Sequence, residues 1–191
     1  LETYYRLPMP LRSMAASVRG YQLLWWRYGP QSDDDTARAL ERDRWSTSAL
    51  REWQDERLGR ILHHAATRVP YYRDHWARRR RAGDHSTWED LANWPVLTKN
   101  ELRTHANAFL IEGARTTSLY HEHTSGTTGK PLNLWFSRDC LREFYAIYDA
   151  RIRRWNGHDR RDRWTNIGGQ QVVPFRQARP PFWVWNAPMR Q

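Results

Sequence analysis

A short stretch rich in glycine and threonine constrains the fold more than any other part of the 191-residue chain. It lies between two segments with the composition of short strands, residues 119 to 124 and residues 132 to 137. The stretch reads Thr124-Ser125-Gly126-Thr127-Thr128-Gly129-Lys130-Pro131. The sequence therefore predicts a loop held between two short strands.

The residues of this loop suit a polyphosphate. Four hydroxyl groups, two glycines and one ammonium group occur within eight residues. Glycines let backbone N–H groups turn toward an anion, hydroxyl groups donate hydrogen bonds to phosphate oxygens, and Lys130 supplies positive charge. The loop is not a Walker A motif, because that pattern requires glycine at the position of Thr124. We therefore expect phosphate binding of a kind different from that of the P-loop NTPases.

Helices are predicted for most of the chain before the loop. Apolar residues at spacings of three and four indicate helices at residues 11 to 28 and 48 to 69, which end at Gly29-Pro30 and at Pro70. The apolar stripe of the first helix consists of Leu11, Met14, Ala15, Val18, Gln22 and Trp25. A basic helix bearing tryptophan could also lie on a membrane surface, but we expect the stripe to pack on the body of the protein.

The remaining pattern predicts an α/β fold from roughly residue 115. A basic helix through Arg81 and a short helical turn at residues 86 to 91 come first, and then Thr98 and Glu101 have the spacing of a capping box. After the loop we expect a helix at residues 138 to 155 and a strand at residues 164 to 167. Residues 1–114 form the predicted helical region, and residues 115–191 form the predicted beginning of an α/β domain. The apolar, aromatic end of the chain has nothing to pack on in this scheme, so we expect a truncated domain.

The charge of the chain raises the question of nucleic-acid binding. The net charge is +10, and only two of the 31 basic residues are lysines, Lys99 and Lys130. Most of the arginines are interpreted as solvated helix faces, including a loose group at residues 151 to 163, so no nucleic acid is expected as a partner. The single cysteine, Cys140, excludes an internal disulfide, and no signal peptide or spanning segment is found, so we expect a soluble, cytoplasmic protein.

The loop closely resembles the phosphate-loop signature of the adenylate-forming (AMP-binding) superfamily. Seven consecutive residues from Thr124 to Lys130 fit that signature, whereas His123 and Leu132 depart from its commonest form. The surroundings are similar to those in phenylacetate-CoA ligase-like and CapK-like proteins. The segments that carry this similarity are Val69-Pro70-Tyr71-Tyr72 and Trp94-Pro95-Val96-Leu97-Thr98-Lys99.

The resemblance implies an ATP-dependent ligase that activates a small-molecule carboxylate as an acyl-adenylate. The resemblance also implies ATP and Mg²⁺ as cofactors, CoA as the acceptor, and a link to surface or capsular polysaccharide synthesis. The loop would bind the β and γ phosphates through Thr124, Ser125, Gly126, Thr127, Thr128, Gly129 and Lys130. The acidic motif, ribose-binding aspartate and C-terminal lysine of the family are not found after Lys130, so no catalytic residue is identified. We expect the N-terminal part of such an enzyme, completed by a missing C-terminal half.

Two other functional classes stay open: a non-catalytic remnant that keeps the loop, and a basic nucleic-acid-binding module. Substrate contacts are placed after the predicted strand at residues 164 to 167, where α/β folds often bind ligands. These candidates are Asn166, Gly168, Gly169 and Gln170. His121 and His123 would share one face of a strand, but no third ligand has zinc-site spacing, so no metal site is expected.

Overall fold

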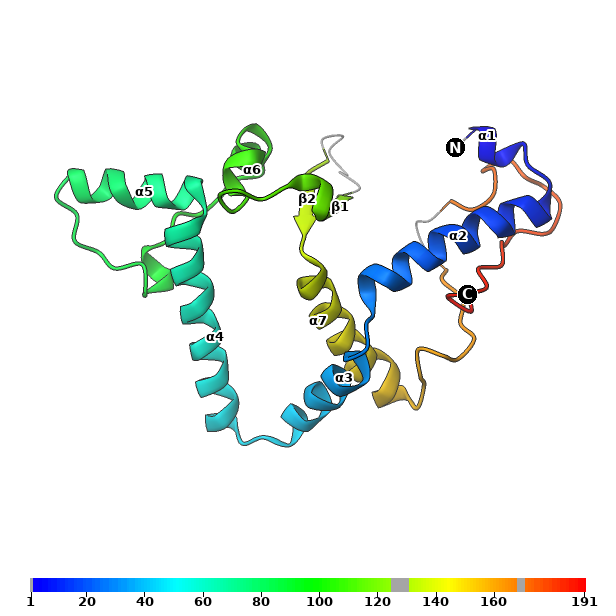
Figure 1. Cartoon of the computed structure of the whole chain (residues 1–191), viewed down its shortest axis with the longest axis horizontal. Helices are drawn as coiled ribbons and strands as arrows, with labels where there is room; N and C mark the ends of the chain where they lie inside the picture. Colours follow the sequence, from blue (N-terminus) through cyan, green and yellow to red (C-terminus); the bar gives the residue numbers. More distant parts are fainter. Residues whose placement is uncertain (1, 125–130, 168–170) are drawn as a thin grey trace. The chain divides into compact units, whose positions relative to one another are not determined.

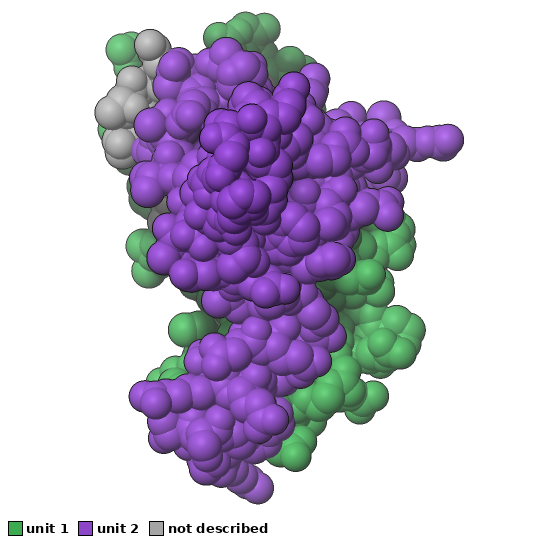
Figure 2. All heavy atoms as spheres, turned by 90° about the vertical axis from the view of Figure 1, so that its left-hand side faces the viewer, with its two compact units in different colours: residues 1–41, 138–191 green, residues 42–137 purple. Residues whose placement is uncertain are grey.

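The computed structural model describes residues 2–124, 131–167 and 171–191. These residues are mostly helical, with a two-stranded antiparallel sheet (Figure 1). The chain divides into two compact units, residues 1–41 with 138–191 and residues 42–137 (Figure 2). The fold is consistent with the predicted mixture of helices and strands, and the domain boundary near residue 115 stays a prediction. In the described part, no helix is long and apolar enough to cross a membrane.

Two helices joined at a proline form the frame of the unit at residues 42–137. Helix α4 (Thr47–Arg68) ends as predicted before Pro70, and Pro70 is also the first residue of α5 (Pro70–Arg81). Val69 has an extended backbone between them, because the residue before a proline avoids the helical conformation. Proline is tolerated in the first turn, where its missing N–H would have no intrahelical partner. The other elements of this unit are η1 (Arg42–Arg44), η2 (Leu91–Asn93), α6 (Lys99–Thr104), η3 (Ala106–Phe109), η4 (Thr116–Ser118), β1 (Tyr120–His123) and β2 (Asn133–Phe136).

Aromatic side chains make the core of this unit. Trp76 of α5 is 3% exposed, and its ring centroid lies 5.7 Å from that of Trp94 and 6.3 Å from that of Trp88. Tyr72, one turn earlier on α5, places its ring 4.8 Å from Trp94. Trp94 Nε1 donates to the carbonyl oxygen of Trp88 at 2.7 Å, so the polar edge of the indole is satisfied. The irregular segment after α5 is thus packed against that helix.

The capping box predicted at the start of α6 is confirmed. Thr98 Oγ1 accepts a hydrogen bond from the Glu101 N–H at 3.2 Å, and Glu101 Oε2 accepts one from the Thr98 N–H at 2.8 Å. The helical turn predicted at residues 86 to 91 lies later in the structure, at Leu91–Asn93, because Asp90 provides its N-cap by accepting the Ala92 N–H.

The unit formed by residues 1–41 and 138–191 is built from three longer helices. They are α2 (Met9–Arg27), α3 (Ser32–Glu41) and α7 (Arg138–Tyr148), and α7 packs on both of the others. The helix predicted at residues 138 to 155 is confirmed in its extent. Its last turns depart from α-helical geometry, as the π-helical η5 (Asp149–Arg153) followed by η6 (Arg154–Asn156). The short α1 (Glu2–Tyr5) begins this unit.

The prediction that the apolar stripe of α2 packs on the protein is wrong. Met14 and Val18 are 62% and 70% exposed, whereas Gly20 on the opposite face is buried. The C-terminal segment covers that opposite face, where the Ala187 N–H donates to Ser17 Oγ at 3.1 Å. The small residues on this side of α2 allow a closer approach than the large apolar ones would.

The strand predicted at residues 164 to 167 is absent, and this segment is irregular. The Trp164 N–H donates to the Arg190 carbonyl oxygen at 3.1 Å, and Trp164 Nε1 donates to that of Met189 at 2.9 Å. The C-terminal turn thus accepts hydrogen bonds from both N–H groups of Trp164. It offers no neighbouring strand with which the residues after Trp164 could pair. Met189 is 5% exposed, so part of the aromatic end does find a packing surface, although Trp183 is 63% exposed.

Candidate phosphate-binding hairpin

The predicted loop lies between the paired strands of an antiparallel hairpin. In the register of β1 and β2, Tyr120 is opposite Phe136 and His123 is opposite Asn133. The two strands predicted on either side of the loop are therefore confirmed. Both strands are short, with four residues each. In a hairpin this short, the loop length and the hydrogen bonds next to the loop help to fix the register of the strands.

Thr124 closes the hairpin at the base of the loop. Its backbone N–H donates to the Leu132 carbonyl oxygen at 3.0 Å, and its Oγ1 accepts the Leu132 N–H at 3.0 Å. The hydroxyl of Thr124 keeps its own proton as a donor, since a threonine hydroxyl can accept and donate at once. Thr124 thus stabilises the end of the hairpin through Leu132, and its hydroxyl group can still donate a hydrogen bond at the start of the loop.

The other predicted loop contacts lie outside the described residues, which end at Thr124 and resume at Pro131. Phosphate binding by these residues stays a prediction. They are Ser125, Gly126, Thr127, Thr128, Gly129 and Lys130.

Histidine side chains on β1 take part in strand pairing. His121 Nε2 lies 3.0 Å from Asn133 Oδ1 across the hairpin, and the His121 ring centroid lies 5.3 Å from that of Trp135. His123 is exposed. Across residues 2–124, 131–167 and 171–191, no group of three or more His, Cys, Asp or Glu side chains is placed to hold a metal ion.

The candidate substrate contacts belong to the unit that contains α7. Asn166 is exposed in the irregular segment after Trp164, while Gly168, Gly169 and Gln170 fall outside the described residues. The strand predicted at residues 164 to 167, at whose carboxyl end these residues would lie, is absent. Their role in substrate binding stays a prediction without that support.

Arginines between residues 151 and 163 form an ion-pair network, which their interpretation as solvated helix faces does not predict. The side chains of Arg153 and Arg160 are only 12% and 16% exposed, so they are not on a solvated helix face. Both form ion pairs with Asp149. The interleaving of aspartates with arginines in this segment is the sequence signal that indicates an internal ion-pair network.

Comparisons with known proteins find two relatives of the chain. Protein CapK of Staphylococcus aureus is 20% identical over 188 residues, which cover 98% of this chain and 40% of the relative. Phenylacetate-coenzyme A ligase of Pseudomonas putida is 33% identical over 113 residues, 59% of this chain and 26% of the relative. No family model matches, and no solved structure gives a significant match.

These matches support a relationship to CapK-like and phenylacetate-CoA ligase-like proteins. The chain spans less than half of the length of either relative. The similarity to CapK extends over almost the whole chain, so it includes the hairpin as well as both helical units.

Proposed function

We propose that this chain corresponds to the N-terminal part of an ATP-dependent, adenylate-forming ligase. In this proposal residues 1–114 are a helical region, and residues 115–191 begin an α/β AMP-binding domain. The observation that supports it best is the loop at residues 124 to 131, carried between two paired strands in a chain related to phenylacetate-coenzyme A ligase.

The loop residues have the chemistry that a polyphosphate needs. The hydroxyl groups of Thr124, Ser125, Thr127 and Thr128 donate to phosphate oxygens, and Gly126 and Gly129 allow the backbone to approach. The ammonium group of Lys130 offsets the charge of the departing pyrophosphate, so the loop contributes by electrostatic stabilisation and positioning. Mg²⁺, when bound with ATP, would neutralise further phosphate charge.

The substrate of the reaction would be a small-molecule carboxylate, and CoA is the proposed acceptor of the acyl group. We extend the proposal to a role in making surface or capsular polysaccharide, which the resemblance of the chain to CapK-like proteins implies. We place the reaction in the cytoplasm, where ATP and CoA are available. In this proposal the groups that complete the acyl-adenylate site come from a C-terminal half of the enzyme; the chain spans 40% and 26% of its two relatives.

The two lysines of the chain provide a matched test of phosphate binding. We would titrate the chain with MgATP and with magnesium pyrophosphate by calorimetry, and repeat this with Lys130→Ala and Lys99→Ala. Lys99 is exposed at the start of α6 and serves as the control. Loss of one charge-assisted contact should weaken binding about tenfold or more in Lys130→Ala and leave Lys99→Ala unchanged.

Two results would contradict the proposal. Absence of binding to both ligands would favour a remnant that keeps the loop without its function. Binding that ignores Lys130, declines steeply with salt and is displaced by DNA or RNA would favour a basic nucleic-acid-binding module.

A further inference from the structure

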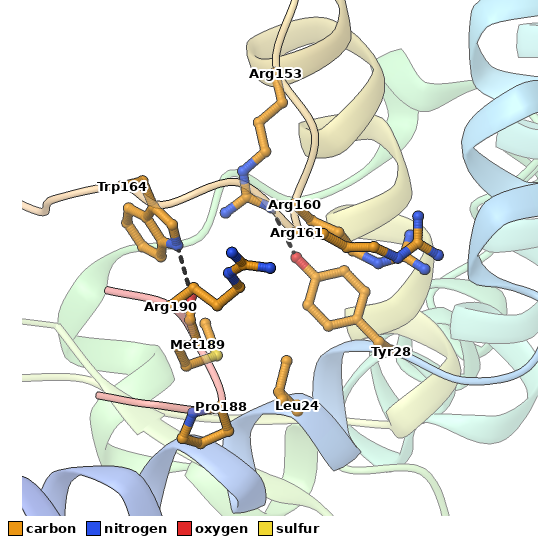
Figure 3. A pocket seen from close by; sticks show the side chains of 9 residues that line it. All are labelled: Leu24, Tyr28, Arg153, Arg160, Arg161, Trp164, Pro188, Met189 and Arg190. Carbon is orange, nitrogen blue, oxygen red and sulfur yellow. Dashed lines mark hydrogen bonds between the residues drawn. The ribbon is translucent and has the colours of Figure 1, made fainter. Parts of the chain in front are cut away.

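A pocket of about 250 Å³ lies in the unit formed by residues 1–41 and 138–191 (Figure 3). It is smaller than the roughly 300–1,000 Å³ of pockets for drug-sized ligands, so it suits a small molecule. One side is strongly basic and the other is apolar. The lining residues are Leu24, Tyr28, Arg153, Arg160, Arg161, Trp164, Pro188, Met189 and Arg190.

Arg190 is held in an unusual backbone conformation that directs its side chain into this pocket. Its φ is +53°, in the left-handed region that residues other than glycine rarely occupy. The surrounding turn enforces this conformation: the Arg190 N–H donates to the Ala187 carbonyl oxygen at 3.1 Å, and Asn186 and Gln191 exchange backbone hydrogen bonds at 2.8 and 3.2 Å. Backbone strain of this kind persists where the neighbouring structure imposes it, often at ligand sites.

The Arg190 guanidinium group points toward the Tyr28 hydroxyl in Figure 3 and makes no ion pair among the described residues. Arg153 is different, because Asp149 pairs with it and its Nη1 donates to the Tyr28 hydroxyl at 3.0 Å. Burial raises the pKa of Tyr28 to about 12, so its hydroxyl group keeps its proton at neutral pH. The hydroxyl donates this proton to Asp149 Oδ1 at 3.4 Å, which is a long hydrogen bond. The centre of the pocket therefore contains the Arg190 cation beside a hydroxyl group that Asp149 and Arg153 hold in place.

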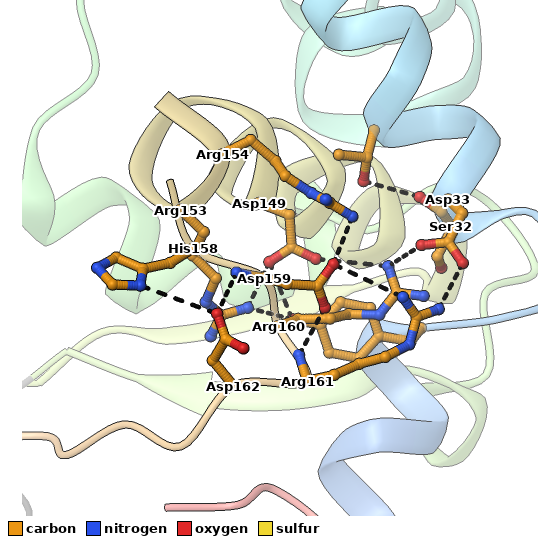
Figure 4. Close-up of polar contacts among 12 residues, drawn as sticks. Ser32, Asp33, Asp149, Arg153, Arg154, His158, Asp159, Arg160, Arg161 and Asp162 are labelled. Atoms are coloured by element: carbon orange, nitrogen blue, oxygen red, sulfur yellow. Dashed lines mark hydrogen bonds and ion pairs between the residues drawn. The ribbon is translucent and has the colours of Figure 1, made fainter. Parts of the chain in front are cut away.

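Arg160 and Arg161 both form ion pairs with Asp33, which lies on α3 (Figure 4). Their guanidinium groups each lie 2.7 Å from a carboxylate oxygen of Asp33, and Arg160 is also 3.7 Å from Asp149. Each arginine keeps other N–H groups, since a guanidinium group carries five donors. The arginines are thus oriented by the protein before any ligand binds.

The charges of the lining do not cancel. Four arginines line the pocket, and two aspartates, Asp33 and Asp149, balance part of their charge. Asp159, which also approaches Arg161 at 3.6 Å, is paired with Arg154 outside the lining. About two positive charges are left, and a phosphate monoester carries about −1.5 to −2 at neutral pH.

The opposite wall of the pocket is apolar. It is formed by Leu24 of α2 and by Trp164, Pro188 and Met189. The hydrogen bond from Trp164 Nε1 to the Met189 carbonyl oxygen fixes the indole ring, and Met189 is 5% exposed. Such a wall contributes affinity by contact with an apolar or aromatic body.

We propose that this pocket binds a small phosphate monoester, with its phosphate group on Arg190 and with Arg160 and Arg161 as neighbouring cations. The apolar body of the ligand packs against Trp164 and Met189. The residues of this site belong to the unit at residues 1–41 and 138–191, whereas the loop at residues 124 to 131 falls within the sequence range of the other unit.

Calorimetric titration of the chain with phenyl phosphate tests the proposal, with inorganic phosphate and benzoate as comparison ligands at one ionic strength. Phenyl phosphate should bind most tightly, because phosphate lacks the apolar body and benzoate carries a single charge. Arg190→Gln should weaken its binding about tenfold or more, and Arg190→Lys should weaken it less. Arg176→Gln, at an exposed arginine of the same unit, is the matched control and should bind as the unaltered chain does.

Several outcomes would overturn the site. They are absence of phenyl phosphate binding, equal affinity for benzoate, and equal losses in Arg190→Gln and Arg176→Gln. Arg190 is exposed, so its replacement should leave the urea concentration at the unfolding midpoint unchanged, which separates a binding defect from a folding defect. Lys130→Ala should bind phenyl phosphate normally, so failure of this site and failure of the ATP loop are distinguishable.

Discussion

Replacing Gly20 by alanine tests whether the C-terminal turn is seated on α2. Alanine in place of glycine inside a helix normally stabilises by about 1 kcal/mol. At Gly20, however, the added Cβ would lie 2.1 Å from Asn186 Oδ1 and 2.8 Å from Pro188 Cγ, both far below van der Waals contact. Asn186 Oδ1 also accepts the Met189 N–H at 3.3 Å, so moving it away breaks a hydrogen bond of the turn.

The magnitude follows from two opposing effects. Overpacking costs about 1–3 kcal/mol, and this cost exceeds the helix-propensity gain of about 1 kcal/mol. We therefore expect Gly20→Ala to lower the free energy of unfolding by about 1 kcal/mol. Displacement of the turn should also weaken phenyl phosphate binding, because the turn carries Arg190.

Gly59 provides the matched control. It lies within α4, and an added Cβ there meets nothing within 4 Å. Gly59→Ala should therefore stabilise by about 0.5–1 kcal/mol. Urea unfolding followed by tryptophan fluorescence measures both variants, and the reasoning is refuted if Gly20→Ala stabilises as much as Gly59→Ala.

Three further predictions concern the unit at residues 42–137 and its capping box. Trp76→Ala should lower the free energy of unfolding by about 3–5 kcal/mol, because this side chain is 3% exposed in the aromatic core. Trp183 of the other unit is 63% exposed, so Trp183→Ala should change the free energy of unfolding little in the same urea experiment. Thr98→Ala should cost about 1 kcal/mol through loss of the α6 N-cap, and no change in the unfolding midpoint would count against the cap. The hydrogen bond from the Thr98 N–H lowers the pKa of the Glu101 carboxyl group, so the stability that Glu101 adds is present above its unfolded pKa of about 4.3 and is lost as pH falls through the folded value. The unaltered chain should thus be more stable than Glu101→Gln at neutral pH, with the difference vanishing in acid; a difference independent of pH would contradict this.

Local signals in the sequence were sufficient for much of the secondary structure. Pro70 marks the end of α4 because its ring and missing N–H are incompatible with a continuing helix. The spacing of Thr98 and Glu101 specifies two reciprocal hydrogen bonds within one turn, so the capping box was predictable without knowledge of the fold. The glycine and threonine content of the loop likewise located the hairpin strands on both sides.

Features that depend on distant residues were not predictable in this way. The periodicity of the apolar residues in α2 predicts a helix with one buried face. Periodicity does not determine which face of the helix another segment will cover. The C-terminal turn packs against the face of α2 that contains Gly20, although the two segments are more than 160 residues apart in the chain. The same turn binds Trp164 and thereby displaces the predicted strand. The arginine pocket also joins three separate stretches, around Tyr28, Arg160 and Arg190.

The central claim is that the loop at residues 124 to 131 binds the phosphates of ATP, and a lysine-directed nucleotide label tests it most directly. Adenosine diphosphopyridoxal forms a Schiff base with a nearby amine, and borohydride reduction makes the adduct permanent for peptide mass spectrometry. The chain has two lysines, so each adduct is assigned without ambiguity to Lys99 or Lys130. We predict fast labelling of Lys130 that MgATP suppresses, and slow, unprotected labelling of Lys99. Equal labelling of both lysines with no protection by MgATP would contradict the proposed phosphate loop.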